Sequence, residues 1–154
     1  MAKIAGSLVF SIDEDFGKKL SKELKELHKR LGSLEELMDA IGEKLLDSTH
    51  ERMSREEDPE GNRWQELSPN YAAAKKALYG DKLMLQITEN LFSTLVWQSG
   101  SDFVQVGSPL IYSGTQQHGL PDKNVEARPY LGLSLEDERT VYELIEDYIL
   151  EALA

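Results

Sequence analysis

The segment Thr94-Leu-Val-Trp-Gln-Ser-Gly-Ser-Asp-Phe-Val-Gln-Val-Gly107 predicts a β-hairpin. Apolar residues alternate with their neighbours on both sides of Ser99–Asp102, which is the pattern of strands that bury one face. Serine, glycine and aspartate between the two strands are turn-forming residues. We therefore expect the fold to contain at least one pair of antiparallel strands.

Before this hairpin, the N-terminal third predicts one strand and two helices. Residues 6–12 alternate in polarity, which predicts a strand. Glu14–Leu31 carries apolar residues at spacings of three and four, which predicts a surface helix with one buried stripe. Ser33 is then expected to cap a second helix that reaches Met53, with Glu36 completing a capping box. The two helices would form a helical hairpin, and the alternative is a single bent helix.

Shorter helices are predicted on either side of the β-hairpin, and a long one closes the chain. Ser68 is expected to cap a helix over Pro69–Tyr79. Leu83–Phe92 predicts another short helix, and Pro109–Gln117 predicts one or two turns that end at Gly119. The last helix, over residues 135–154, is expected to carry on its inner side Leu135, Val141, Leu144, Ile145, Tyr148, Ile149 and Leu153.

These elements predict the α+β class, because the strands are separated by runs of helices. We expect a single compact domain over residues 1–154, with an N-terminal helical hairpin and a C-terminal amphipathic helix. Its sheet should be small and mostly antiparallel, and should include the β-hairpin near residues 94–107. A chain of 154 residues is long enough to bury a substantial core.

The composition excludes several functional classes. The chain has 28 acidic and 17 basic residues, and its net charge of −11 disfavours sequence-specific binding to nucleic acid. No apolar run reaches the roughly 20 residues that cross a bilayer, and Asp13–Asp15 stands where a signal peptide would need small residues. Without cysteine, the chain has no disulfide framework, thiolate nucleophile or cysteine metal site.

No residues combine into a recognisable catalytic, cofactor or metal site, so we expect none of the three. His28, His50 and His118 lie far apart, and none has a partner at metal-ligand spacing. Asp58 begins a segment with some likeness to a calcium loop, but its glycine and closing glutamate are misplaced. One enzymatic alternative is a small hydrolase that uses Asp58, His118 and Arg128, which would have to converge in a pocket.

Charge is distributed unevenly along the chain. The last helix is strongly acidic, which indicates either a solvated face or a docking surface for a basic protein. The second interpretation would make the protein a cytoplasmic adaptor. The middle third is the least acidic and carries Arg63, Lys75, Lys76 and Lys82. This polarity is either ordinary surface charge or a means for identical subunits to pack head to tail.

Four segments from residue 58 to the last helix form an ordered set of motifs. The first is Asp58-Pro-Glu-Gly-Asn-Arg-Trp-Gln-Glu-Leu-Ser68, and the second is Leu-x-x-Thr-x-x-Leu at residues 85–91. The third is Tyr112-Ser-Gly-Thr-Gln-Gln-His-Gly119, and the fourth is Ala127-Arg-Pro-Tyr-Leu-Gly-Leu-Ser134. Together they resemble the phage virion morphogenesis, or tail completion, family of Mu-like phages and prophages, although Asn90 replaces a glycine and His118 is displaced within its motif. The resemblance makes the following motif residues candidates for an interface: Asp58, Pro59, Gly61, Trp64, Tyr112, His118, Gly119, Arg128, Pro129, Tyr130, Leu131 and Gly132.

The resemblance implies a non-enzymatic structural protein of a tailed phage or prophage, which acts in tail completion or head-tail joining as part of a ring. It implies a homo-oligomer in the virion, assembled in the host bacterial cytoplasm, and contacts with the tail tube, the tail terminator or the head-tail connector. The loop Leu120–Glu126, braced by Arg128 and Pro129, would become ordered on contact with a neighbour. Deleting residues 120–126 should then abolish assembly and leave folding nearly intact.

Overall fold

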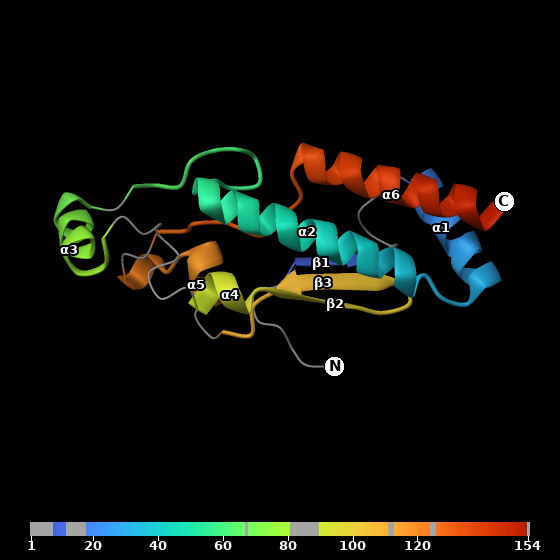
Figure 1. The fold of residues 1–154 in the computed structure, drawn as a ribbon, viewed down its shortest axis with the longest axis horizontal. Helices are drawn as coiled ribbons and strands as arrows, with labels where there is room; N and C mark the ends of the chain where they lie inside the picture. Colours follow the sequence, from blue (N-terminus) through green and yellow to red (C-terminus); the bar gives the residue numbers. More distant parts are fainter. Residues whose placement is uncertain are drawn as a thin grey trace.

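The computed structural model describes residues 8–11, 18–66, 68–80, 90–110, 113–123 and 126–153 (Figure 1). Its elements follow one another as β1 (Leu8–Ser11), α1 (Lys18–Leu31), α2 (Glu35–Arg55), α3 (Pro69–Tyr79), α4 (Asn90–Thr94), β2 (Val96–Ser99), β3 (Phe103–Gly107), α5 (Ser113–His118), the 3-10 helix η1 (Pro121–Lys123) and α6 (Leu135–Leu153). This combination of helices with a small antiparallel sheet confirms the predicted α+β class. Helices α1 and α2 follow one another across residues 32–34, while the contacts of α2 are with β2, β3 and α6, so the expected packing of α1 against α2 as a helical hairpin stays a prediction.

The sheet has three antiparallel strands in the order β1-β3-β2. The predicted β-hairpin is confirmed as β2 and β3, and the predicted N-terminal strand joins it as β1, with Leu8 opposite Val106. Because side chains two residues apart lie on the same face of a strand, Val104 and Val106 point the same way. Both are buried, so this face of β3 packs against the core.

Helix α2 is the central element of the core, since it contacts β2 and β3 as well as α6 (Figure 1). A glycine allows its close approach to the sheet: a Cβ on Gly42 would lie 2.8 Å from Val104 Cγ2 and 2.9 Å from Trp97 Cδ2. The buried apolar side chains around this contact are Leu27, Leu34, Leu37, Met38, Ile41, Leu45, Met53, Trp64, Leu91, Leu95, Val104, Val106, Tyr130, Leu131, Val141 and Ile145.

The capping box predicted at Ser33 is wrong. Helix α2 begins at Glu35, and its N-cap is Leu34 rather than Ser33. Leu34 is fully buried, and its N–H donates to the Ser101 carbonyl oxygen at 2.8 Å. The Ser33 hydroxyl instead accepts from the Glu35 N–H at 3.1 Å. A contact with the hairpin turn, distant in sequence, therefore sets where the helix begins.

The residues of the last helix that were predicted to face the core do so in the middle of the helix, but the prediction is wrong at its first residue. Val141 and Ile145 are fully buried in α6, whereas Leu135 is 82% exposed. Leu135 occupies the first helical position, where the chain has just turned into the helix and its side chain points to solvent. The Leu153 side chain lies outside the described residues.

Of the two short helices predicted next to the β-hairpin, the structure tests one in full and the other only in part. The turn of helix predicted before Gly119 is confirmed as α5, and Gly119, at φ 74°, closes it by donating its N–H to the Thr115 carbonyl oxygen at 2.7 Å. Of the helix predicted over residues 83–92, positions 83–89 lie outside the described residues, and α4 begins at Asn90.

Helix α3 lies at one end of the molecule, beyond the end of α2 (Figure 1). It begins and ends as the sequence predicted. The Ser68 hydroxyl accepts from the Tyr71 N–H at 3.4 Å, and Gly80, at φ 74°, donates its N–H to the Lys76 carbonyl oxygen at 3.0 Å. Its described side chains are exposed or half-buried, and none belongs to the core.

None of the helices in the described ranges combines the length and the apolar character that crossing a membrane requires.

Candidate functional site

The segment 126–134 is fastened to the chain that follows α2. The Trp64 indole N–H donates to the Pro129 carbonyl oxygen at 2.7 Å, and the Arg128 guanidinium donates to the Gln65 carbonyl oxygen at 3.3 Å. The Trp64 side chain is itself buried. These contacts join two motifs that are more than 60 residues apart in sequence.

The side chain of Gln117, at the end of α5, fastens the same segment from another side. Its Oε1 accepts from the Tyr130 N–H at 2.9 Å and from the Leu131 N–H at 3.0 Å. Its Nε2 donates to the Leu131 carbonyl oxygen at 2.9 Å. The amide thus pairs with the backbone as a neighbouring strand would, and it satisfies polar groups that are costly to bury without a partner.

Tyr130 is the largest fully buried side chain of the segment. Its hydroxyl donates to the Ser113 carbonyl oxygen at 3.2 Å. Burial raises the pKa of this phenol to about 12, so Tyr130 is neutral at physiological pH. Its role is to anchor the segment in the core.

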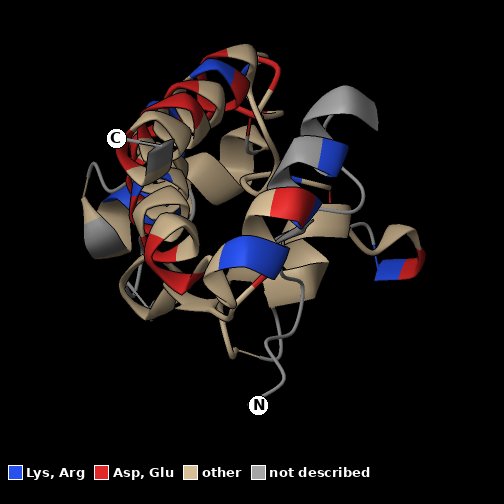
Figure 2. Cartoon of the chain, turned by 90° about the vertical axis from the view of Figure 1, so that its right-hand side faces the viewer, with Lys and Arg blue, Asp and Glu red and all other residues tan. Residues whose placement is uncertain are grey.

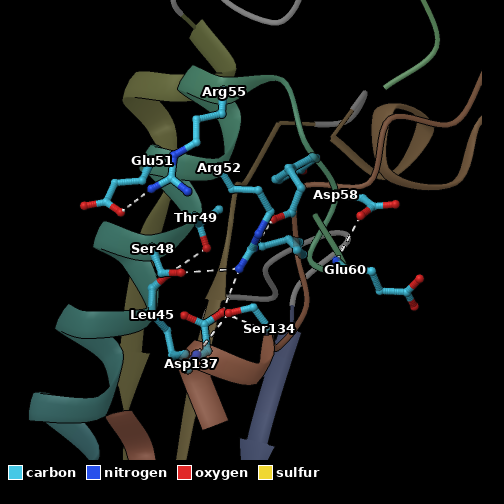
Figure 3. Close-up of polar contacts among 12 residues, drawn as sticks. Leu45, Ser48, Thr49, Glu51, Arg52, Arg55, Asp58, Glu60, Ser134 and Asp137 are labelled. Carbon is cyan, nitrogen blue, oxygen red and sulfur yellow. Dashed lines mark hydrogen bonds and ion pairs between the residues drawn. The ribbon is translucent and has the colours of Figure 1, made fainter. Parts of the chain in front are cut away.

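Arg52 of α2 and Asp137 of α6 form a buried ion pair beneath this segment (Figure 3). Arg52 Nη2 lies 2.7 Å from Asp137 Oδ2, and each side chain is 6% exposed. Arg52 Nη1 also donates to the Tyr130 carbonyl oxygen at 2.6 Å. Burial lowers the pKa of the Arg52 guanidinium, while Asp137 raises it, and a guanidinium remains charged in either case. One side chain therefore joins three parts of the fold.

Asp137 also closes the first turn of α6. Its Oδ2 accepts from the Ser134 N–H at 2.9 Å, and the Ser134 hydroxyl accepts from the Asp137 N–H at 3.0 Å. This reciprocal arrangement is a capping box with aspartate in place of glutamate. Ser134 is therefore the N-cap of the last helix.

The turn after α2 packs on the same segment. Asp58 Oδ1 accepts from the N–H groups of Glu60 and Asn62, both at 2.9 Å, and Gly61 has a φ of 87°. A Cβ on Gly132 would lie 2.5 Å from Pro59 Cγ, so only glycine fits against this turn.

Most of the candidate residues therefore converge on one region, which supports treating them together. The residues brought together are Asp58, Pro59, Gly61, Trp64, Arg128, Pro129, Tyr130, Leu131 and Gly132. His118 is exposed at the end of α5, Gly119 closes that helix, and Tyr112 lies outside the described residues. Sequence reasoning missed Arg52 and Gln117, although Arg52 lies on the apolar face of α2, seven residues after Leu45, where a charged residue is unusual.

A groove of about 680 Å³ opens beside the ion pair, between the C-terminal half of α2, the turn at residues 57–61 and residues 133–141. Seven carboxylates and three basic side chains line it: Asp47, Glu51, Glu57, Asp58, Glu60, Glu136 and Asp137 against Lys44, Arg52 and Arg55. Figure 2 shows further acidic residues, in red, along the helix that ends at the C-terminus. The groove thus suits a positively charged ligand rather than an anion.

The three residues of the hydrolase alternative do not meet in this groove. Asp58 lines it, whereas His118 and Arg128 are not among the described residues of its lining. Nor do the described ranges contain a group of three or more histidine, aspartate or glutamate side chains placed to hold a metal ion.

Comparison with known proteins agrees with the motifs. The phage virion morphogenesis family matches residues 15–150 of the chain, a range that includes all four motifs. The chain is also 30% identical over 117 residues to the protein named "Putative capsid assembly protein G" of Escherichia phage Mu. The aligned residues cover 71% of this chain and 75% of the Mu protein. No solved structure matches the chain.

Proposed function

We propose that this chain, which belongs to the phage virion morphogenesis family, completes the tail or joins it to the head of a tailed phage or prophage, as one subunit of a ring. Family membership already gives it a role in phage assembly, together with other phage structural proteins. The finer proposal names its neighbours as the tail tube, the tail terminator or the head-tail connector. We further propose that residues 1–154 act as one domain, in the virion and, during assembly, in the host cytoplasm.

The proposal rests on the contacts that the motif residues make with the backbone. Trp64, Arg128 and Gly132 hold backbone segments against one another, and Arg52 joins them to α6. Contacts of this kind fix the position of a backbone: the Trp64 indole and the Arg52 guanidinium each donate to a carbonyl oxygen of the segment 126–134. Such a body is suited to present surfaces to neighbouring subunits, as a structural protein requires.

The contact with a neighbour is proposed to involve the loop Leu120–Glu126. Its described part includes η1, whose side chains are exposed. The loop leaves α5 and returns at Arg128, whose N–H donates to the Gln116 carbonyl oxygen at 2.8 Å. Both ends of the loop are therefore held by the body, so a neighbour would have to order only a short stretch of chain.

The test uses phage tails assembled without this protein. Purified wild-type protein should bind these tails and restore their joining to heads, as seen by electron microscopy and by infectious titre. Protein in which residues 120–126 are replaced by a short glycine-serine linker should keep the circular dichroism spectrum of the wild type and lose binding.

Two results would contradict the proposal. Wild-type protein that does not bind tails or heads would remove the assembly step itself. A linker variant that unfolds would show that the loop supports the fold rather than the contact.

A further inference from the structure

We propose that α3 of one copy docks in the acidic groove of the next copy, so that identical chains associate head to tail. This inference rests on the proposed ring and names the contact between its subunits. It is carried by two features of the same molecule. A basic helix with exposed apolar side chains lies at one end (Figure 1), and an acidic groove is lined by α2, the turn at residues 57–61 and residues 133–141.

Helix α3 has the chemistry of a ligand for this groove. It contains Lys75 and Lys76 and no acidic residue. Two of its apolar side chains face solvent, since Leu78 is 75% exposed and Tyr71 is 53% exposed. Large exposed apolar side chains on a short helix are costly unless another surface covers them. At 11 residues the helix is about 16 Å long.

The groove has complementary features. Two of its carboxylates are neutralised within the chain, Asp137 by Arg52 and Glu51 by Arg55, the latter pair at 3.2 Å. Glu60 and Glu136 line it without an ion pair to any other described residue. Leu135, at 82% exposure, adds an apolar side chain to the same lining, where Leu78 of a neighbour could pack.

The helix cannot easily reach the groove of its own chain. Trp64 and Gln65, which precede α3 in the chain, are held by hydrogen bonds to Pro129 and Arg128. The described residues that line the groove come from α2, the turn at 57–61 and residues 133–141, and α3 is not among them. A helix and a groove at different places on identical chains make a heterologous contact, which generates a ring when the rotation closes.

The contact should be weak for a single pair of chains. A docked 11-residue helix covers less than the roughly 800 Å² per partner of a standard interface. When a ring closes or the chains bind to a tail, each chain is held near its neighbours. The helix and the groove then meet at a high effective concentration, and this stabilises the assembly. Opposite charges should also make the association weaker as the salt concentration rises.

The absence of cysteine from the chain allows a direct test. The variants Leu78→Cys and Leu135→Cys are prepared separately, one with a larger tag, mixed, and treated with a bismaleimide that couples two thiols. The matched control pairs Leu78→Cys with Leu150→Cys, because Leu150 is 67% exposed on the same helix as Leu135. Docking predicts that the first pair couples about tenfold or more faster than the control, since docked thiols have a raised effective concentration. Equal rates would overturn the proposal.

A charge exchange tests the electrostatic part. Lys75→Glu/Lys76→Glu, placed in the Leu78→Cys chain, should reduce coupling to the control rate. Combining it with Glu60→Lys/Glu136→Lys in the Leu135→Cys chain should restore coupling, because the charges are opposite again. Failure of the exchange to restore it, with both chains folded by circular dichroism, would count against docking in this groove.

The same charge reversal on α1 is the control for net charge. Lys29→Glu/Arg30→Glu changes exposed side chains by an equal charge and should leave coupling unchanged. Coupling within one chain that carries both Leu78→Cys and Leu135→Cys, when diluted alone, would overturn the proposal in favour of the chain's own groove.

The proposed function is tested by a separate measurement, the binding of the protein to phage tails that lack it. Tail binding without coupling between Leu78→Cys and Leu135→Cys would refute the docking and leave the assembly role standing. Coupling without tail binding would support the docking and refute the assembly role.

Discussion

Removing one partner of the Arg52–Asp137 pair should destabilise the protein far more than removing both. In Asp137→Leu, the Arg52 guanidinium stays buried without a counter-charge, because both side chains are only 6% exposed. Uncompensated buried charges of this kind typically cost about 3–5 kcal/mol. The same substitution removes the acceptor of the Ser134 N–H, which adds about 1 kcal/mol.

The double variant Arg52→Met/Asp137→Leu should recover most of the electrostatic cost. What remains is the unpaired Tyr130 carbonyl oxygen, which loses its 2.6 Å bond, and the weakened cap of α6, which loses the bond from the Ser134 N–H to the Asp137 carboxylate. Each contributes about 1–2 kcal/mol. The double-mutant cycle should therefore give a coupling energy of roughly 2 kcal/mol or more.

Urea unfolding followed by circular dichroism measures the four free energies, provided that the slope with denaturant is unchanged. The matched control is Glu51–Arg55 on the same helix, a 3.2 Å pair whose side chains are 68% and 60% exposed. Glu51→Leu should cost less than about 1 kcal/mol, because exposed pairs are screened by solvent. Single variants of Arg52 and Asp137 that cost no more than this control, or a cycle without coupling, would refute the reasoning.

Three further predictions concern close packing and the buried phenol. Gly42→Ala should lower the free energy of unfolding, measured with urea, by about 1–3 kcal/mol, because the added Cβ would meet side chains at 2.8–2.9 Å. The control Gly114→Ala adds a Cβ with nothing within 4 Å and should be neutral or stabilising, so equal effects of the two changes would contradict this packing. Gly132→Ala should cost a similar 1–3 kcal/mol through its 2.5 Å contact with Pro59 Cγ, and unchanged stability would rule the contact out. Because the pKa of Tyr130 is raised from 10.0 to about 12, the unfolded state loses its phenolic proton first, so stability should fall as pH rises from 10 towards 12. Ultraviolet titration should show a late tyrosine step that loses the amplitude of one phenol in Tyr130→Phe, and a late step of unchanged amplitude would contradict the assignment.

Local sequence signals were sufficient for most elements of the fold. The alternating residues around Ser99–Asp102 predicted β2 and β3, and Ser68 predicted the start of α3. These signals work because strand alternation, caps and turns depend on residues within a few positions of one another. The start of α2 could not be predicted in this way, since the Leu34 N–H is held by Ser101.

The candidate site was predicted only in part. The motifs that resemble the family included Trp64, Arg128 and Gly132, and the match to residues 15–150 confirms that resemblance. The motifs did not show that Arg52 would be the residue that joins them, because its partner Asp137 lies 85 positions away and read as one more acidic residue of a surface helix. A charge within an apolar stripe was the available signal.

By itself, the sequence determined the α+β class, the β-hairpin, the cap of α3 at Ser68 and the excess of acid, because each follows from local periodicity, turn chemistry or composition. The tertiary structure alone decided that Arg52 is buried against Asp137 and Tyr130, and that Leu135 and α3 face solvent. The physical reason is that burial and ion pairing depend on which distant segments meet. Many carboxylates could pair with Arg52 on the basis of sequence, and packing of α2 against α6 leaves one within 2.7 Å.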